Sequence, residues 1–195
     1  MVSMKRLLFL AASLLCVGCS SATTVSNRTP KGNPNAAVVV EEYADIQCPA
    51  CRAAHEGITK QLIQTYGDRI RFDFMHFPLR SIHRYALEAA EASECAADQG
   101  KFWEFVDTAY KNQRELNSDV LPEWARQVGV NVPQFEQCIK SHARRNTVLA
   151  DYTRGRERDV GGTPTFFVNG KQVQTGFDTV SAAIDAELER LTQRL

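Results

Sequence analysis

Two cysteines separated by two residues, Cys48 and Cys51, are the side chains best suited to chemistry in this 195-residue chain. Thiols at this spacing in the first turn of a helix can close a disulfide with little movement of the backbone. The partial positive charge at the start of the helix stabilises a thiolate, so we expect a lowered pKa at Cys48. Pro49 suits that first turn, where its missing N–H costs no hydrogen bond. The spacing therefore predicts Cys48 as the attacking or attacked sulfur and Cys51 as the resolving thiol.

Two other uses of a CxxC motif are a zinc site and covalent haem attachment. A structural zinc site needs four ligands, whereas Cys95 and Cys138 stand alone instead of forming a second close pair. Haem attachment needs His directly after the second cysteine, and this chain has Arg52 there. The four histidines have neither metal-ligand spacing nor a companion nucleophile. The sequence therefore predicts neither a metal nor another cofactor.

The elements that position these cysteines alternate between strand and helix and then become purely helical. A β-branched run predicts a buried strand over residues 36–43, and a helix follows it to about residue 66. Alternating apolar residues predict a second strand over 70–75, which completes a βαβ unit. After a helical stretch, strand signals return at 165–168 and 171–175, joined by a tight Asn-Gly turn and followed by a final helix. This order predicts an α/β fold interrupted by a helical subdomain.

The N-terminus has the features of an export signal. Basic residues and a short apolar run predict a signal peptide over residues 1–18, since the run is too short to span a bilayer. Gly18 before Cys19 resembles a bacterial lipoprotein cleavage site, at which Cys19 would be lipidated; cleavage after Ala22 is the alternative. Either route predicts a location outside the cytoplasm, where disulfides persist. The small and polar residues over 19–35 predict a flexible tether.

The charge of the chain argues against a nucleic-acid partner. The 23 basic and 23 acidic residues balance, and neither sign forms a long block. A nucleic-acid binder would instead concentrate basic residues on one face. Removal of the signal peptide takes only basic residues with it, so the mature chain becomes slightly acidic.

Three segments together resemble the DsbA-like branch of the thioredoxin superfamily. They are EYADIQCPAC at 42–51, QGKFWEF at 99–105 and GTPTFFVNG at 162–170. A CxxC after a strand, a long helical insertion and Gly-Thr-Pro before a strand are jointly specific, and the match covers nearly all of the chain after the tether. The resemblance implies a thioredoxin fold with an inserted all-helical subdomain. Its parts would be the first thioredoxin segment at 36–77, the insertion at 78–160 and the second thioredoxin segment at 161–195.

The resemblance also implies roles for single residues. Pro164 corresponds to the cis proline that faces the active-site cysteines, where it exposes the backbone of Thr163 to an extended substrate. Glu42 corresponds to a buried acid that exchanges a proton with Cys51. Alternation along the strand turns the neighbouring Glu41 to the opposite face, which agrees with burial of Glu42. A carboxylate in solvent at the end of the strand is the alternative.

The third cysteine pair, Cys95 and Cys138, lies in the helical insertion. Cys138 shares an apolar stripe with Phe135 and Ile139, which fits a buried, unreactive thiol. The export signal, together with similar cysteines in some family members, favours a structural disulfide between Cys95 and Cys138 instead.

The function implied by the resemblance is thiol:disulfide exchange on exported proteins. We expect a monomeric, lipid-anchored dithiol oxidase that acts on exported polypeptides and is reoxidised by a quinone-linked membrane partner. Strongly oxidising members carry His between the cysteines where this chain has Ala50, so reduced oxidising power is expected. A reductase or isomerase kept reduced by a membrane electron donor is the alternative. A lipid-anchored chaperone or binding module is the alternative of another class.

Overall fold

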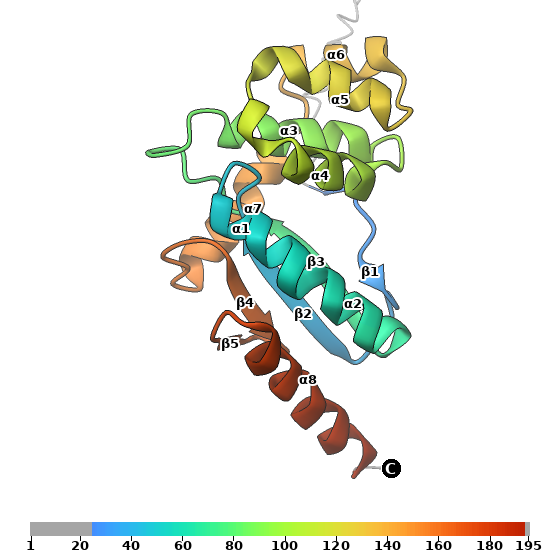
Figure 1. Ribbon diagram of the computed structural model, residues 1–195, viewed down its shortest axis with the longest axis vertical. Coiled ribbons are helices and arrows are strands. Elements are labelled where there is room, and N and C mark those ends of the chain that lie inside the picture. Colours follow the sequence, from blue (N-terminus) through green and yellow to red (C-terminus); the bar gives the residue numbers. More distant parts are fainter. Residues whose placement is uncertain (1–24, 194–195) are drawn as a thin grey trace, which may run out of the picture.

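A five-stranded mixed sheet forms the centre of the computed structural model, which describes residues 25–193 (Figure 1). The strands are β1 (Lys31–Gly32), β2 (Val38–Ala44), β3 (Ile70–His76), β4 (Thr165–Val168) and β5 (Lys171–Val173). Their order across the sheet is β1-β3-β2-β4-β5, with β2 and β3 parallel and the other pairs antiparallel. The valine-rich β2 is therefore the central strand, as its β-branched run predicts.

The helix that carries Cys51, called the active-site helix from here on, follows β2 and consists of three consecutive pieces. These are α1 (Pro49–Ala54), a π-helical turn (His55–Thr59) and α2 (Lys60–Tyr66). A 3-10 turn (Gly67–Arg69) then leads into β3. The predicted helix to about residue 66 is confirmed, whereas the π-helical turn within it is a feature that the apolar spacing does not reveal.

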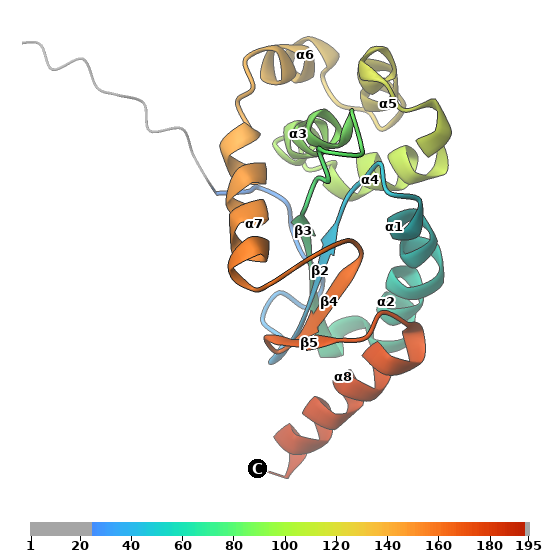
Figure 2. The ribbon, with the colours of Figure 1, turned by 90° about the vertical axis from the view of Figure 1, so that its left-hand side faces the viewer.

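The remaining helices form the insertion and the C-terminus. They are α3 (Ala86–Ala97), α4 (Phe102–Lys111), 3-10 turns (Gln113–Glu115 and Ser118–Val120), α5 (Leu121–Gln127), α6 (Val132–Lys140), α7 (Arg145–Glu157) and α8 (Phe177–Thr192). The active-site helix and α8 pack on one face of the sheet and α7 on the other, while α3 to α6 stand over one end of β2 and β3 (Figures 1 and 2). The predicted thioredoxin fold with a helical insertion is confirmed.

Three apolar clusters join these layers, and the smallest lies on the face of the sheet that α7 covers. The other two are larger. One lies between the sheet and the helices α2 and α8, and it includes Val38, Val40 and Ile184, all fully buried. The other fills the helical insertion and extends down to Cys48 and Cys51, so the two thiols lie where the insertion meets the sheet. None of the helices within residues 25–193 is both long enough and apolar enough to cross a bilayer.

The prediction of a tether over 19–35 is wrong from residue 25 onward. β1 pairs with β3, and the guanidinium of Arg28 lies between the carboxylates of Glu94 and Asp151, with a distance of 2.6 Å to Asp151. Composition missed this because the segment is held by ion pairs and backbone pairing and buries little apolar surface. The rest of the tether, with Cys19 and the predicted signal peptide, lies outside the described residues.

Candidate active site

Cys48 and Cys51 are free thiols at the start of the active-site helix. Cys48 occupies the N-cap position, Pro49 begins the helix, and Pro49 and Ala50 are exposed beside it. Cys48 is 6% exposed and Cys51 is fully buried. The sulfur that can meet a polypeptide is thus Cys48, because Cys51 lies beneath it.

The two thiols have opposite acidities. A hydrogen bond from the Cys51 side chain, supported by hydrogen bonds from the backbone of Cys51 and Ala50, outweighs burial and lowers the pKa of Cys48 to about 5. Burial, the hydrogen bond to Cys48 and the charge of Glu42 raise the pKa of Cys51 above its ordinary value. At neutral pH the dithiol therefore holds a thiolate at Cys48 and a proton on Cys51.

Glu42 lies on the central strand β2, close enough to Cys51 for its charge to raise the pKa of that thiol. It is 1% exposed and pairs with Phe74 on β3 and Phe166 on β4. Thr59 Oγ1 donates a hydrogen bond of 2.8 Å to Glu42 Oε2. Burial outweighs this hydrogen bond and raises the pKa of Glu42 to about 7. The carboxyl can therefore gain or lose a proton near neutral pH, the range in which a general acid or base is effective.

The loop before β4 lies across from Cys48. The peptide bond between Thr163 and Pro164 is cis, and Cys48 Sγ lies 3.6 Å from the carbonyl oxygen of Thr163. Both loop residues are partly exposed. An extended peptide that reaches the Cys48 sulfur would therefore find the backbone of Thr163 beside it, in the manner of strand addition at an edge.

Two buried polar residues that the sequence analysis missed hold the loop before Cys48. Gln113, from the 3-10 turn after α4, donates hydrogen bonds to the carbonyl oxygens of Ile46 (2.7 Å) and Cys48 (3.0 Å). Asp45 accepts hydrogen bonds from the backbone N–H of Gln47 (2.7 Å) and of Leu79 (2.9 Å). The position of Asp45 just before the CxxC is a signal that could have been used, whereas nothing in the sequence around Gln113 indicates its role.

Each of the four histidines contacts a carboxylate. The pairs are His55–Asp107 (2.6 Å), His76–Glu94 (3.0 Å), His83–Asp45 (2.8 Å) and His142–Glu91 (2.8 Å). Within residues 25–193, no group of three or more His, Cys, Asp or Glu side chains could hold a metal ion. The four histidines thus each have a carboxylate partner, and the spacing of the histidines in the sequence did not indicate these partners.

Cys95 and Cys138 form a disulfide between α3 and α6, far from the reactive thiols in the sequence. The bond closes a span of 43 residues across the helical insertion. The alternative, in which Cys95 and Cys138 are buried free thiols, is therefore wrong.

A helical insertion set over a thioredoxin sheet, with a reactive dithiol where the two meet, is the architecture of the DsbA-like thiol:disulfide oxidoreductases. The chain matches the family model described as Thioredoxin over residues 24–186, and it belongs to the thioredoxin family. The same fold is found in oxidised BdbD from Bacillus subtilis, which is 20% identical with a TM-score of 0.75 over 84% of this chain and 94% of that one. It is also found in α-DsbA2 from Wolbachia pipientis, which is 22% identical with a TM-score of 0.71 over 82% of this chain and 86% of that one.

The chain is also similar to part of a much longer protein. It is 35% identical over 153 residues to the Na(+)/H(+) antiporter NhaA 1 of Mycobacterium sp. (strain KMS), which is 77% of this chain and 25% of the antiporter. The chain thus spans about a quarter of the length of the curated relatives it matches. Antiport is named for those whole proteins, and the likeness does not assign it to this chain.

Proposed function

We propose that this protein is an extracytoplasmic dithiol oxidase that introduces disulfides into exported polypeptides through Cys48 and Cys51. The observation that carries the proposal is the opposite shift of the two thiol pKa values, lowered to about 5 at Cys48 and raised at Cys51. A stabilised Cys48 thiolate favours the reduced form of the enzyme, which makes its disulfide a stronger oxidant. The direction of electron flow then runs from substrate thiols to the enzyme.

The reaction begins when a substrate thiolate attacks Cys48 Sγ of the oxidised enzyme. The Cys48–Cys51 bond breaks, Cys51 leaves as a thiolate, and a mixed disulfide forms between Cys48 and the substrate. Because a thiol of high pKa is a poor leaving group, Cys51 needs a proton, and the buried carboxyl of Glu42 is placed to supply it. Glu42 becomes a carboxylate in this step.

The second step releases the product. Another thiolate of the substrate attacks the substrate sulfur of the mixed disulfide, so that Cys48 leaves as a thiolate and the substrate disulfide forms. The low pKa of Cys48 makes it the better leaving group at this stage. Two electrons have then passed from the substrate dithiol to the Cys48 and Cys51 pair. A quinone-linked membrane partner would remove these electrons and restore the enzyme disulfide.

Substrate binding is proposed at the loop of Thr163 and Pro164. An extended segment around the substrate cysteine would pair with the Thr163 backbone, which holds its sulfur close to Cys48. Main-chain pairing of this kind does not depend on the identity of the side chains, which suits an enzyme with many exported substrates.

The second candidate is a reductase or isomerase that uses the same atoms in the reverse direction. Ala50 is the observation that favours it, because no His lies between the cysteines to stabilise the Cys48 thiolate further. Such an enzyme would be kept reduced by a membrane electron donor. A chaperone or binding module, by contrast, would retain its function in a Cys48→Ser variant.

The reduction potential of the Cys48 and Cys51 pair, measured against glutathione, distinguishes the two directions. An oxidase requires a value well above that of thioredoxin, and a potential below about −250 mV would exclude it. The redox state in cells, read by alkylation of free thiols, should be mainly disulfide for the oxidase. Cys48→Ser serves as the control and should lose the oxidation of a reduced, unfolded protein.

The location and membrane attachment form a separate part of the proposal. Lipidation at Cys19 would hold the enzyme, as a monomer, at the membrane that contains its redox partner. Mass spectrometry of the mature N-terminus tests this directly. A diacylglycerol-modified Cys19 supports the anchor, and an unmodified N-terminus at Thr23 contradicts it.

A further inference from the structure

The backbone of Asp45, three residues before Cys48, contacts both reactive cysteines. Its N–H donates a hydrogen bond of 3.4 Å to Cys51 Sγ. Its carbonyl oxygen accepts the N–H of Cys48 at 3.0 Å. Asp45 is 1% exposed, so both contacts are made from inside the protein. The buried sulfur of Cys51 therefore has a backbone donor beside it.

The carboxylate of Asp45 ties this backbone to the loop over residues 77–85, between β3 and α3. Oδ1 accepts the N–H of Gln47 at 2.7 Å, within the turn before Cys48. Oδ2 accepts the N–H of Leu79 at 2.9 Å and lies 2.8 Å from His83 Nδ1. Because a carboxylate oxygen can only accept a hydrogen bond, the proton of this contact is on the His83 nitrogen. The position of Asp45 thus depends on the loop that follows β3.

That loop is fastened to the active site at one further point. Gln47 Oε1 accepts the N–H of Tyr85 at 2.7 Å. Figure 1 shows the loop projecting from the body of the protein beside the start of the active-site helix. Its contacts with Asp45 and Gln47 lie at its two ends, whereas Ile82 near its tip is 71% exposed. The loop therefore supports the residues before Cys48 from the side.

Cys51 needs such support when it becomes a thiolate. Burial is the largest influence on the pKa of Cys51 and raises it, and the hydrogen bond to Cys48 and the charge of Glu42 raise it further. Of the main influences, the hydrogen bond from the Asp45 backbone is the one that lowers it. A fixed N–H directed at a charge that develops in the reaction is among the most effective ways to stabilise a transition state.

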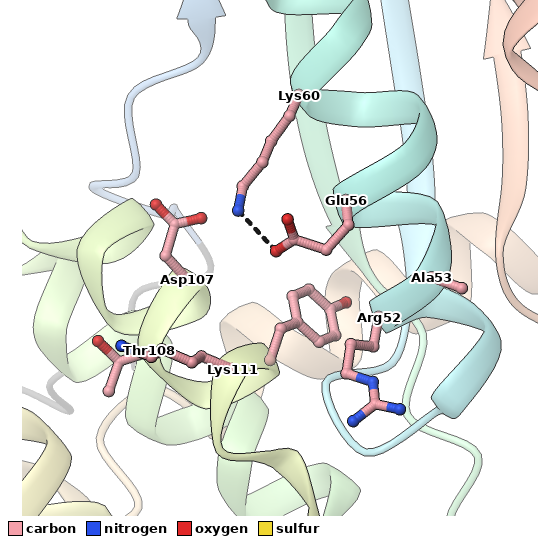
Figure 3. Close-up of a pocket in the computed structure, with 8 residues that line it drawn as sticks. Arg52, Ala53, Glu56, Lys60, Asp107, Thr108 and Lys111 are labelled. Atoms are coloured by element: carbon pink, nitrogen blue, oxygen red, sulfur yellow. Dashed lines mark hydrogen bonds and ion pairs between the residues drawn. The ribbon is translucent and has the colours of Figure 1, made fainter.

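The cations on the outer side of the active-site helix give Cys51 less support. Arg52 and Lys60 line a groove of about 670 Å³ between this helix and α4 (Figure 3). Figure 3 also shows Lys60 paired with Glu56, at 2.6 Å. Both cations reach solvent, whereas Cys51 is fully buried. Water in the groove weakens the effect of these charges on the buried sulfur.

We propose that the backbone N–H of Asp45 stabilises the Cys51 thiolate as the enzyme disulfide opens, and that His83 is a positioning residue that holds this N–H through the Asp45 carboxylate. The inference rests on the proposed role of Cys51 as the resolving thiol. It holds for either direction of electron flow, because the same bond opens and closes in both.

The step moves one electron pair between sulfurs. A thiolate attacks Cys48 Sγ, the bond between Cys48 and Cys51 breaks, and its electron pair passes to Cys51 Sγ. The Asp45 N–H donates a hydrogen bond to this sulfur and keeps its proton. The carboxyl of Glu42 then supplies the proton that neutralises Cys51. When Cys51 attacks the mixed disulfide, the same changes run in reverse.

The opening of the enzyme disulfide by glutathione tests the inference. Mass spectrometry of acid-quenched samples gives the initial rate of this reaction, in which Cys51 is the leaving group. A reference reaction uses the Cys51→Ala protein with Cys48 bound to glutathione, which 2-mercaptoethanol opens so that Cys48 leaves. The Asp45 N–H has no thiolate to stabilise in the reference reaction. A group that acts on Cys51 changes the first rate and leaves the second unchanged.

Variants at both ends of the contact should slow the first reaction. Asp45→Asn leaves one oxygen where the carboxylate has two, which breaks contacts to the loop, and should slow it by about tenfold. His83→Leu removes one contact and should slow it by about threefold. Loss of the Asp45 charge would by itself favour a nearby thiolate, so charge does not account for the slowing. His83→Asn places an amide donor near the position of Nδ1 and should restore the rate.

Arg80→Leu is the matched control, because Arg80 lies in the same loop but contacts the ring of Tyr152. Both rates should stay unchanged in this variant. The His83 side chain is 17% exposed, so His83→Leu provides a folded test protein even if Asp45→Asn does not fold. Equal slowing of both reactions, or unchanged rates in Asp45→Asn and His83→Leu, would overturn the inference. An unaltered protein that forms no disulfide between Cys48 and Cys51 would instead contradict the proposed function.

Discussion

The hydrogen bond from Cys51 is expected to be the main support of the Cys48 thiolate, and Cys51→Ala removes it. This bond is the largest of the influences that lower the pKa of Cys48 to about 5, and the backbone hydrogen bonds of the first turn remain in the variant. A hydrogen bond to a charged group contributes about 1.5–3 kcal/mol. At about 1.4 kcal/mol per pKa unit, its loss raises the pKa of Cys48 by about 1–2 units. We therefore expect the Cys48 thiol of the variant to titrate between about pH 6 and 7.

The pH dependence of alkylation by iodoacetamide, together with thiolate absorbance, measures this midpoint. Because the thiolate still predominates or equals the thiol at pH 7, the alkylation rate there should fall by no more than about twofold while the midpoint moves. Cys48→Ala is the control, and its remaining Cys51 should titrate above the ordinary range of a thiol, since burial and Glu42 disfavour its charge. A midpoint that stays near pH 5 in Cys51→Ala would refute the reasoning and assign the shift to the helix backbone and Thr163.

Four further outcomes are expected. Folding raises the pKa of Glu42 from 4.5 to about 7, so the folded reduced protein binds the Glu42 proton more tightly than the unfolded chain does. The free energy of unfolding therefore falls as the pH rises from 4.5 to 7. Denaturant unfolding should therefore show Glu42→Gln more stable above pH 7 by up to about 3 kcal/mol, with no difference at low pH. Ala50→His should raise the reduction potential by tens of millivolts in the glutathione equilibrium, and an unchanged value would contradict it. Replacing Cys95 and Cys138 by Ala opens a loop of 43 residues and should cost about 4 kcal/mol of unfolding free energy. Arg28→Met leaves two buried carboxylates without their cation and should cost about 3–5 kcal/mol, unlike a change in a flexible tether.

The sheet and the active-site helix were predictable because their signals are local. The valine run of β2 and the alternation in β3 report burial on the scale of a few residues, and the structure differs from the predicted limits of these strands by two residues or fewer. The placement of Cys48 at the start of a helix follows from the same local signals. The family resemblance then added the residues that meet across the fold, such as Thr163 and Pro164.

The features that sequence reasoning missed depend on contacts between distant residues. Arg28 lies in a polar segment whose order comes from Glu94 and Asp151, which follow it by 66 and 123 positions. His55 and Asp107 are likewise 52 positions apart. Composition and periodicity average over neighbours in sequence, so they cannot report a carboxylate delivered by another helix. Isolated polar residues in otherwise apolar surroundings were the available signal, but they do not identify their partners.

The helical insertion contributes to the active site because its residues contact Cys48 and bury Cys51. β2 and the active-site helix provide Glu42, Cys48 and Cys51, but the carbonyl oxygen of Cys48 is hydrogen-bonded by Gln113 of the insertion. The apolar cluster of the insertion also buries Cys51, and this burial is the largest cause of its raised pKa. The difference in acidity between the two thiols therefore depends on the docking of the insertion on the sheet. Mutations that loosen this docking should lower the pKa of Cys51 toward its ordinary value, even when they lie far from the CxxC in the sequence.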